Sequence, residues 1–238
     1  MCLIALIIVT TIVSMVPLNA KALMDSTSNA MYETVTTAII NRIVSDELPT
    51  GTQLLPMNLF SPFLSYLEVS LLVGIVLTSP VMFYELYAFI NPALYENERK
   101  YLWLSVLSFT ALFLLGDAFG YYYLTPITYR FFINGYRILG LSPMYEFGDF
   151  MSLTVEMVLL TGIVFTVPVF FLLLVQFRLL STDIVTKHRK IVYVAIFIVI
   201  SLLPNDPSPI DTILLFVPTM ILIEISVFIG KRIEKNRK

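Results

Sequence analysis

The sequence predicts an all-α membrane protein that crosses the bilayer with six helices. Of its 238 residues, 58% are hydrophobic and only 13% are charged, which is about half the charged share of soluble domains. The mean hydropathy is strongly positive, at +0.85. Several apolar stretches also approach the length of about 20 residues that a helix needs to cross the hydrocarbon core. Together these observations indicate a polytopic protein with a single membrane domain.

The first predicted span covers residues 1–17, whose run MCLIALIIVTTIVSMV carries no charge. A cleaved signal peptide is the alternative, because Ala20 and Ala22 form an A-x-A pattern, but the positively charged segment that begins a signal peptide is missing. A polar outer loop over residues 18–62 comes next. It holds the turn formers Pro49, Gly51 and Pro56 and has room for one or two short helices, one of them near residues 32–44.

The other five predicted spans cover residues 63–90, 101–124, 150–177, 191–203 and 212–229. A loop over residues 126–149 separates the third span from the fourth. The fifth span has only 13 residues, or about 20 Å of helix against a core of about 30 Å. This span and the short sixth one imply local bilayer thinning or shielding by neighbours.

Three prolines fall inside these spans: Pro80, Pro168 and Pro218. Each removes a backbone hydrogen bond and tends to kink its helix. Several kinked helices favour a concave arrangement over a straight bundle. Gly116 and Gly120 form a G-x-x-x-G pattern in the third span, which lets helices approach closely, although such a pattern also arises often by chance.

The basic residues predict the orientation. With six spans, both termini lie on one side of the membrane, and the loops and tail on that side hold 11 of the 15 lysines and arginines, all but Lys21, Arg42, Arg130 and Arg137. The positive-inside rule places that side in the cytoplasm. We therefore expect a multi-pass protein of the plasma membrane, with both termini and the loop FINPALYENERK, residues 89–100, in the cytoplasm.

Composition and motifs argue against several classes of function. The net charge of −2 provides no basic field for nucleic acid. A single cysteine, Cys2, and a single histidine, His188, argue against an internal disulfide and the usual cysteine or histidine metal sites. No G-x-S-x-G, H-E-x-x-H, Walker or dinucleotide motif occurs. We expect no enzyme activity, no metal site and no cofactor.

Acidic side chains within the predicted spans are candidate functional groups, because each costs about 3 kcal/mol at the bilayer centre on insertion scales. They are Glu68, Glu85, Asp117, Glu156 and Glu224. Glu68 and Glu85 lie near the ends of the second span, where reaching the headgroup layer is the simpler interpretation. Asp117 and Glu156 fall at a similar depth in the outer half. They could share a water pocket or a proton, or each could find a separate hydroxyl or backbone partner. Glu224 also needs a partner.

Four segments resemble one family. TSPVMFYELYAFINPALYENERK, residues 78–100, resembles the second span and first cytoplasmic loop of TatC, the multispanning core subunit of the twin-arginine protein translocase, whose pattern there is approximately SPxxxYQxWxFxxPxLYxxER. LFLLGDAFGYYYLTPITYRFF resembles its third span, GIVFTVPVFFLLL its fourth, and LPNDPSPIDTILLFVPTMILIEISVFIGK its last hairpin. The resemblance runs from about residue 60 to residue 231. It implies a TatC-like fold and a signal-peptide receptor that exports folded proteins across the cytoplasmic membrane.

The resemblance implies that the FINPALYENERK loop binds two consecutive arginines of a signal peptide. Glu98 matches the family's loop glutamate that meets the arginines, and Arg99 matches its basic neighbour. Phe89 and Pro92 match positions that shape the loop. Glu96 is a second acid that could hold the other guanidinium, since a planar guanidinium can donate two parallel hydrogen bonds to a carboxylate. In the alternative, both glutamates pair with the neighbouring basic residues in a solvated loop.

The chain departs from the family pattern at several positions. The H-L-x-E-L-R segment that begins family members has no counterpart here, which we interpret as a truncated or misassigned start. The family's glutamate before the fourth-span proline is Thr166, and the glutamine after the second-span tyrosine is Glu85. Asp117 or Glu156 could take over the role of the missing glutamate, although Glu156 lies about 15 Å from Thr166 along the helix.

The resemblance also implies partners. Single-span subunits like TatA and TatB would pack on polar positions of the last two spans or near Thr166, in an oligomeric complex that is surrounded by lipid and driven by the proton gradient. The candidate intramembrane polar and partner contacts are Glu85, Asp117, Glu156, Thr166 and Glu224. The alternative function is a proton-coupled secondary transporter of a small solute, in which Asp117 and Glu156 form the relay.

Overall fold

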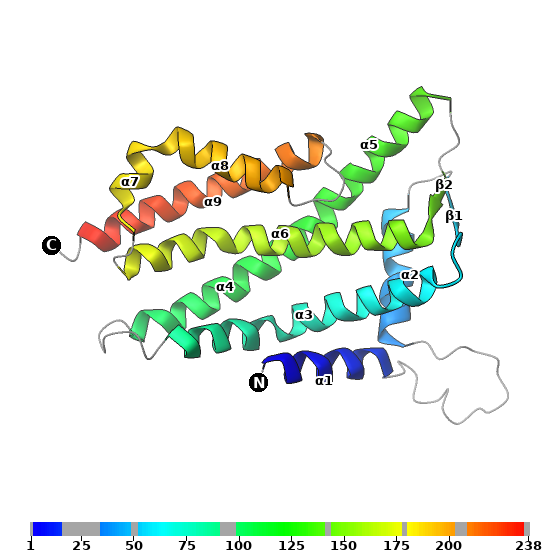
Figure 1. Ribbon diagram of the computed structural model, residues 1–238, viewed down its shortest axis with the longest axis horizontal. Coiled ribbons are helices and arrows are strands. Elements are labelled where there is room, and N and C mark those ends of the chain that lie inside the picture. Colours follow the sequence, from blue (N-terminus) through cyan, green and yellow to red (C-terminus); the bar gives the residue numbers. More distant parts are fainter. Residues whose placement is uncertain are drawn as a thin grey trace. The chain divides into compact units, whose positions relative to one another are not determined.

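The structure is a computed structural model that describes residues 2–15, 34–48, 52–90, 99–140, 144–177, 180–202 and 209–235. Over these ranges the chain is helical apart from short connections and two three-residue strands (Figure 1). It divides into two compact units. The first comprises Met1–Leu86 and Tyr129–Val155, and the second comprises Tyr87–Thr128 and Glu156–Lys238. The fold is thus that of an all-α polytopic membrane protein.

The first unit holds α1 (Cys2–Met15), α2 (Val35–Glu47), β1 (Gln53–Leu55), most of α3 (Ser61–Ile90), most of α5 (Thr125–Ile138), β2 (Met144–Glu146) and the start of α6 (Phe147–Gln176). α2 begins where Thr34 Oγ1 accepts a hydrogen bond from the Thr37 amide at 3.3 Å, as expected of a threonine N-cap. This confirms the predicted short helix near residues 32–44. The parallel pairing of β1 with β2 was not predicted.

A polar cluster of aromatic and hydroxyl groups fixes the centre of the first unit. The Tyr129 hydroxyl donates to the Phe150 carbonyl at 2.6 Å and lies 2.8 Å from Thr154 Oγ1. The Tyr129 ring stacks on the Phe150 ring, and both side chains are buried. Because the polar tip of Tyr129 is satisfied, a large aromatic residue can be buried here without an unpaired hydroxyl.

The second unit holds α4 (Arg99–Phe119), the π-helical turn η2 (Gly120–Leu124), most of α6, α7 (Thr182–Lys187), α8 (Arg189–Leu202) and α9 (Pro209–Lys235). One core cluster joins α6, α8 and α9 through Val164, Ile200 and Leu215. At the other end of α9, the Thr182 amide donates to Glu234 Oε1 at 3.0 Å. This contact satisfies an amide at the start of α7 that has no partner within its own helix.

Within the described residues, four helical segments are long and apolar enough to cross a bilayer: Ser61–Ala88, Leu104–Ile138, Phe147–Gln176 and Pro209–Lys235. α1 lies within the predicted first span, α8 begins two residues before the predicted fifth span, and each has 14 residues. Each is therefore about 21 Å long, which is short for the hydrocarbon core. The two short helices belong to different units.

The predicted loop over residues 126–149 is wrong for residues 126–138, because the helix continues through η2 into α5. Pro126, the second residue of α5, has no amide proton to continue the hydrogen-bond ladder. However, Thr125 donates both its amide and its hydroxyl, the latter at 2.9 Å, to the Gly120 carbonyl. This wide i→i+5 turn keeps the backbone hydrogen-bonded just before the proline. The helix ends instead near Gly140, whose φ of 69° suits glycine after a helix C-terminus.

The three prolines predicted inside spans lie within α3, α6 and α9. Near two of these prolines, a side-chain hydroxyl donates a hydrogen bond to a backbone carbonyl of the same helix. Ser79 Oγ donates at 2.8 Å to the Val76 carbonyl, which lies four residues before Pro80 and therefore lacks its amide donor. Thr219 Oγ1, next to Pro218, donates to the Leu215 carbonyl at 2.7 Å, one residue after the Leu214 carbonyl that lacks its amide donor. The Ser79 bond shows how a membrane helix can tolerate an internal proline.

Candidate functional site

The predicted signal-peptide site lies between α3 and α4. α3 ends at Ile90 and α4 begins at Arg99, so Phe89 is in the last turn of one helix and Arg99 is the first residue of the next. Pro92, Glu96 and Glu98 lie outside the described residues. The structure therefore places the two ends of the predicted site on helix termini.

The predicted site is followed by the start of α4, which is a helix N-terminus. A helix N-terminus carries a partial positive charge and four amides without partners inside the helix. Glu98 immediately precedes Arg99, the first residue of α4. Negatively charged groups are in general stabilised near a helix N-terminus.

Asp117 is the most deeply buried of the intramembrane acids that we predicted as site residues. Its side chain is 6% exposed, and neither carboxyl oxygen has a hydrogen-bond partner among the residues that the structure describes. The carboxyl group lies against Gly162 of α6, where an added Cβ would collide with Asp117 Oδ1 and lie 2.9 Å from the Phe113 ring. The glycine at residue 162 therefore makes room for the acid.

The level at which Asp117 lies against α6 can be compared with that of Glu156, with which it could share a pocket. Glu156 is six residues before Gly162, which is about 9 Å along α6 and on a different side of the helix. Thr166 is four residues after Gly162, about 6 Å away and on a similar side. Asp117 is therefore closer in level to Thr166 than to Glu156. The Thr166 hydroxyl itself donates to the Ile163 carbonyl at 2.6 Å.

Glu224 has partners on a neighbouring helix that we did not predict. The Tyr193 hydroxyl donates to Glu224 Oε1, and Arg189 Nη1 lies 3.6 Å from the same oxygen. Arg189 and Tyr193 are four residues apart on α8, so they share one helix face. That spacing was visible in the sequence, but we assigned Arg189 to a loop. Glu85, on α3 in the first unit, is half-buried.

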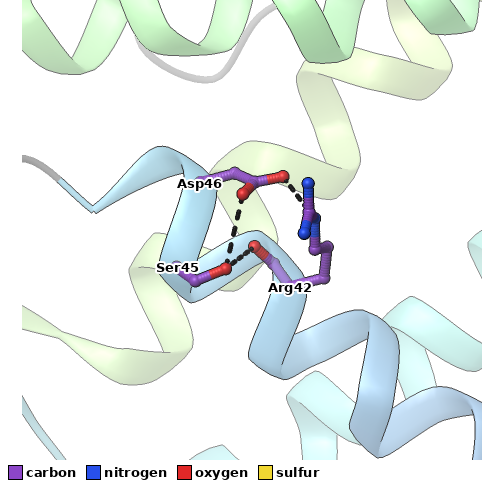
Figure 2. A network of polar contacts seen from close by, with 3 residues as sticks. All are labelled: Arg42, Ser45 and Asp46. Atoms are coloured by element: carbon purple, nitrogen blue, oxygen red, sulfur yellow. Dashed lines mark hydrogen bonds and ion pairs between the residues drawn. The ribbon is translucent and has the colours of Figure 1, made fainter.

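α2 carries a second group of charges that sequence reasoning did not single out. Arg42 Nε lies 2.7 Å from Asp46 Oδ2, and Ser45 Oγ donates to the Arg42 carbonyl at 2.9 Å (Figure 2). This exposed ion pair is worth about 0.2–1 kcal/mol. Glu47 is the next residue, but its side chain is buried. The end of α2 therefore has one carboxylate facing water and one carboxyl group facing the protein.

Burial raises the pKa of Glu47 to about 7, with a further increase from Asp46 and an opposing effect of Arg130. A raised pKa means that the folded protein binds a proton more tightly than the unfolded chain, whose carboxyl titrates near 4.5. The contribution of Glu47 to the free energy of unfolding should therefore be largest below pH 4.5 and decline as the pH rises to about 7. At about 1.4 kcal/mol per pKa unit, the decline is at most about 3 kcal/mol.

Thermal unfolding in detergent across this pH range will measure the effect. Glu47→Gln should flatten the dependence, because glutamine keeps the shape and does not titrate. An unchanged pH profile in this variant would remove Glu47 as its source.

Comparisons with known proteins agree on one family. The family model described as Sec-independent protein translocase protein (TatC) matches residues 1–218. The chain is 31% identical over 188 residues to the Sec-independent protein translocase protein TatC of Desulforapulum autotrophicum, covering 79% of this chain and 68% of that protein. For the protein of the same name from Escherichia coli, the identity is 29% over 204 residues, covering 86% and 76%.

A solved structure is similar over nearly the whole chain. A crystal structure of the twin arginine translocase receptor TatC matches with a TM-score of 0.73 and 25% sequence identity. The match covers 98% of this chain and 94% of the crystallised one. The chain is thus similar to this solved structure in both its fold and its sequence.

Proposed function

Because the chain belongs to the TatC family of Sec-independent protein translocase proteins, we propose that it is the signal-peptide receptor and membrane core of a twin-arginine translocase. Its relatives are protein translocase components, so the role is transport. The observation that carries the receptor role is the acidic loop between α3 and α4. It is a short polar segment, with Glu96 and Glu98, that ends at the N-terminus of a membrane helix.

The proposed contact is between the two arginines of an export signal and the carboxylates of this loop. A guanidinium presents a planar fork of donors that matches a carboxylate with two parallel hydrogen bonds. Glu98 directly precedes Arg99 in the sequence, and Arg99 is the first residue of α4. Phe89 and Arg99, at the two helix ends, and Pro92 between them shape the loop that presents the acids. Loop and termini lie in the cytoplasm in this proposal, as the distribution of basic residues predicts.

The interaction energies indicate different roles for the charged and the apolar part of the signal peptide. A hydrogen bond to a charged group contributes about 1.5–3 kcal/mol, and an exposed ion pair about 0.2–1 kcal/mol. Two arginines therefore provide specificity more than affinity. The remaining affinity comes from the apolar part of the signal peptide, which lies along the membrane helices.

Single-span subunits like TatA and TatB are the proposed partners within the membrane. Glu224 and its partners Arg189 and Tyr193 form a polar group on α8 and α9, and the Glu224 side chain is 41% exposed. A polar group on these helices is the position where such a partner would gain a hydrogen bond in lipid. The transporter alternative is less well supported, since Asp117 faces Gly162 and lies about 9 Å along α6 from the level of Glu156.

Site-specific crosslinking tests the receptor role. A crosslinker placed beside the two arginines of a signal peptide should capture wild-type protein, and Glu98→Gln should reduce the yield by about tenfold or more, since one charged hydrogen bond is lost. The matched control is Asp183→Asn, which removes an exposed acid on α7 and should leave the yield unchanged. A peptide with lysines in place of both arginines should also lose capture. Undiminished capture by Glu98→Gln would exclude Glu98 from the site.

A further inference from the structure

An exposed apolar turn precedes α3. Residues 56–60, PMNLF, form the connection from β1 to α3, and we call them the PMNLF turn. Leu59 is 97% exposed, Met57 70% and Phe60 69%. None of these positions is within the candidate span, which begins at Ser61. Three large apolar side chains in one short turn form a surface that is unfavourable in water.

Several amide groups in and next to this turn are hydrogen-bonded or have no proton, which lowers the cost of moving them out of water. Asn58 accepts two hydrogen bonds: the Phe60 amide donates to its Oδ1 at 3.1 Å, and the Ser61 amide donates to its carbonyl at 3.2 Å. Pro56 and Pro62, on either side, have no amide proton. Of the seven amide positions from residue 56 to residue 62, which include the first two residues of α3, these four are thus hydrogen-bonded or have no proton.

The neighbours of the turn belong to the ends of membrane helices in the same unit. Ser61 packs against Gly148 in the first turn of α6, where an added Cβ would lie 3.0 Å from Ser61 Cβ. β1 pairs with β2, which places the exposed Met144 opposite Gln53 (Figure 1). The turn therefore lies beside the start of two candidate spans, Ser61–Ala88 and Phe147–Gln176.

We propose that the PMNLF turn is a lipid anchor, which inserts Met57, Leu59 and Phe60 between the headgroups and the upper acyl chains of the bilayer. Leu59 and Phe60 are within one helical turn of the start of a span, so they lie at the depth of the interface when α3 crosses the membrane. The surface is continuous with the lipid-facing side of α3, where Phe63 and Leu64 are exposed. The inference rests on the membrane span alone, so it stands or falls independently of signal-peptide binding.

Fluorescence quenching in vesicles tests the anchor. Trp103, the single tryptophan, is replaced in Trp103→Phe, and Leu59→Trp then provides one reporter on the turn. The protein is reconstituted in phosphatidylcholine vesicles containing lipids brominated near the headgroup end or near the methyl end of the acyl chain. We expect about a twofold loss of emission with the shallow bromines, a smaller loss with the deep ones, and little quenching by aqueous acrylamide.

Two controls calibrate depth. Leu71→Trp, on the exposed face of α3 inside the span, should be quenched most by the deep bromines. Asp183→Trp, on the exposed side of α7 outside the candidate spans, should respond to acrylamide alone. Phe60→Trp is a second reporter in case Leu59→Trp does not fold. Adding Asn58→Ala to the Leu59→Trp reporter leaves the Phe60 amide without its side-chain acceptor and should make the tryptophan more accessible to acrylamide.

Two results would overturn the proposal. Quenching of Leu59→Trp by acrylamide, without an effect of brominated lipid, would place the turn in water. Protection from both quenchers that disappears on dilution of the protein in the membrane would show that a second copy of the chain covers the surface.

Discussion

Leucine in place of Gly116 is expected to prevent stable packing of α4 on α6. A Cβ at residue 116 would lie 2.7 Å from the Thr161 carbonyl oxygen and 2.8 Å from Gly162 Cα. Both are backbone atoms, which cannot rotate away as a flexible side chain can. Even alanine should therefore cost about 1–3 kcal/mol of unfolding free energy, the usual range for overpacking. Leucine adds three further carbons at the same contact, so its effect should be larger.

Gly135 provides the matched control on another membrane helix. It lies in α5, where an added Cβ would meet nothing within 4 Å. Gly135→Ala should be neutral or should stabilise the protein by about 0.5–1 kcal/mol, because alanine is the better helix former. Thermal unfolding of the purified protein in detergent will measure the two variants side by side. Equal stabilities for Gly116→Leu and Gly135→Ala would show that the close approach of α4 to α6 does not limit stability.

Asp211→Ala is expected to produce the second large loss. Thr128 Oγ1 donates to Asp211 Oδ1 at 2.5 Å, and both residues are buried. The bond joins the start of α5 to the first turn of α9, and the two residues are 83 positions apart in the sequence. A hydrogen bond to a carboxylate is worth about 1.5–3 kcal/mol, and the truncation also leaves a cavity. We expect a loss of about 2–4 kcal/mol of unfolding free energy.

Two further variants separate the hydrogen bond from the volume of the side chain. Asp211→Asn keeps an oxygen that can accept from Thr128, so it should lose less than Asp211→Ala. Thr128→Val removes the donor. The Thr128→Val and Asp211→Ala changes should then be less than additive when combined, because they remove the same bond. Strict additivity in this double-mutant cycle would show that the two side chains are not coupled.

The apolar helices are the part of the fold that was most predictable from the sequence. The hydropathy of α3, α6 and α9 alone identifies them as membrane spans. Charged or proline-containing segments lie within a few residues of their ends and mark their approximate limits. α5 was missed because Pro126 looked like a helix stop, and because TPITYRFFINGYRI mixes arginines with aromatic residues. The wide turn that preserves the helix depends on a hydrogen bond from Thr125 to Gly120, and a rule for proline cannot reveal it.

The acidic side chains within the spans show a second limit of prediction from the sequence. Counting residues along a span gives depth, and on that basis Asp117 and Glu156 are predicted to lie at a similar depth, either in one pocket or with separate partners. Which side of a helix faces which neighbour depends on packing, and Gly162 attracts no notice in the sequence until Asp117 is seen against it. Glu47 ends a polar run, SDE, that suggests a solvated helix end. Its side chain is nevertheless buried, and the distant Arg130 acts electrostatically on its pKa.

The turn η2 has a consequence for the helical phase of α5. One extra residue in the turn rotates every later side chain of the helix by about 100° relative to an uninterrupted α-helix. Thr128 reaches Asp211 with that rotation in place. The length of the GYYYL segment, as well as its chemistry, thus sets the direction in which α5 points the Thr128 hydroxyl toward α9. An insertion or deletion in this segment would rotate Thr128 away from Asp211.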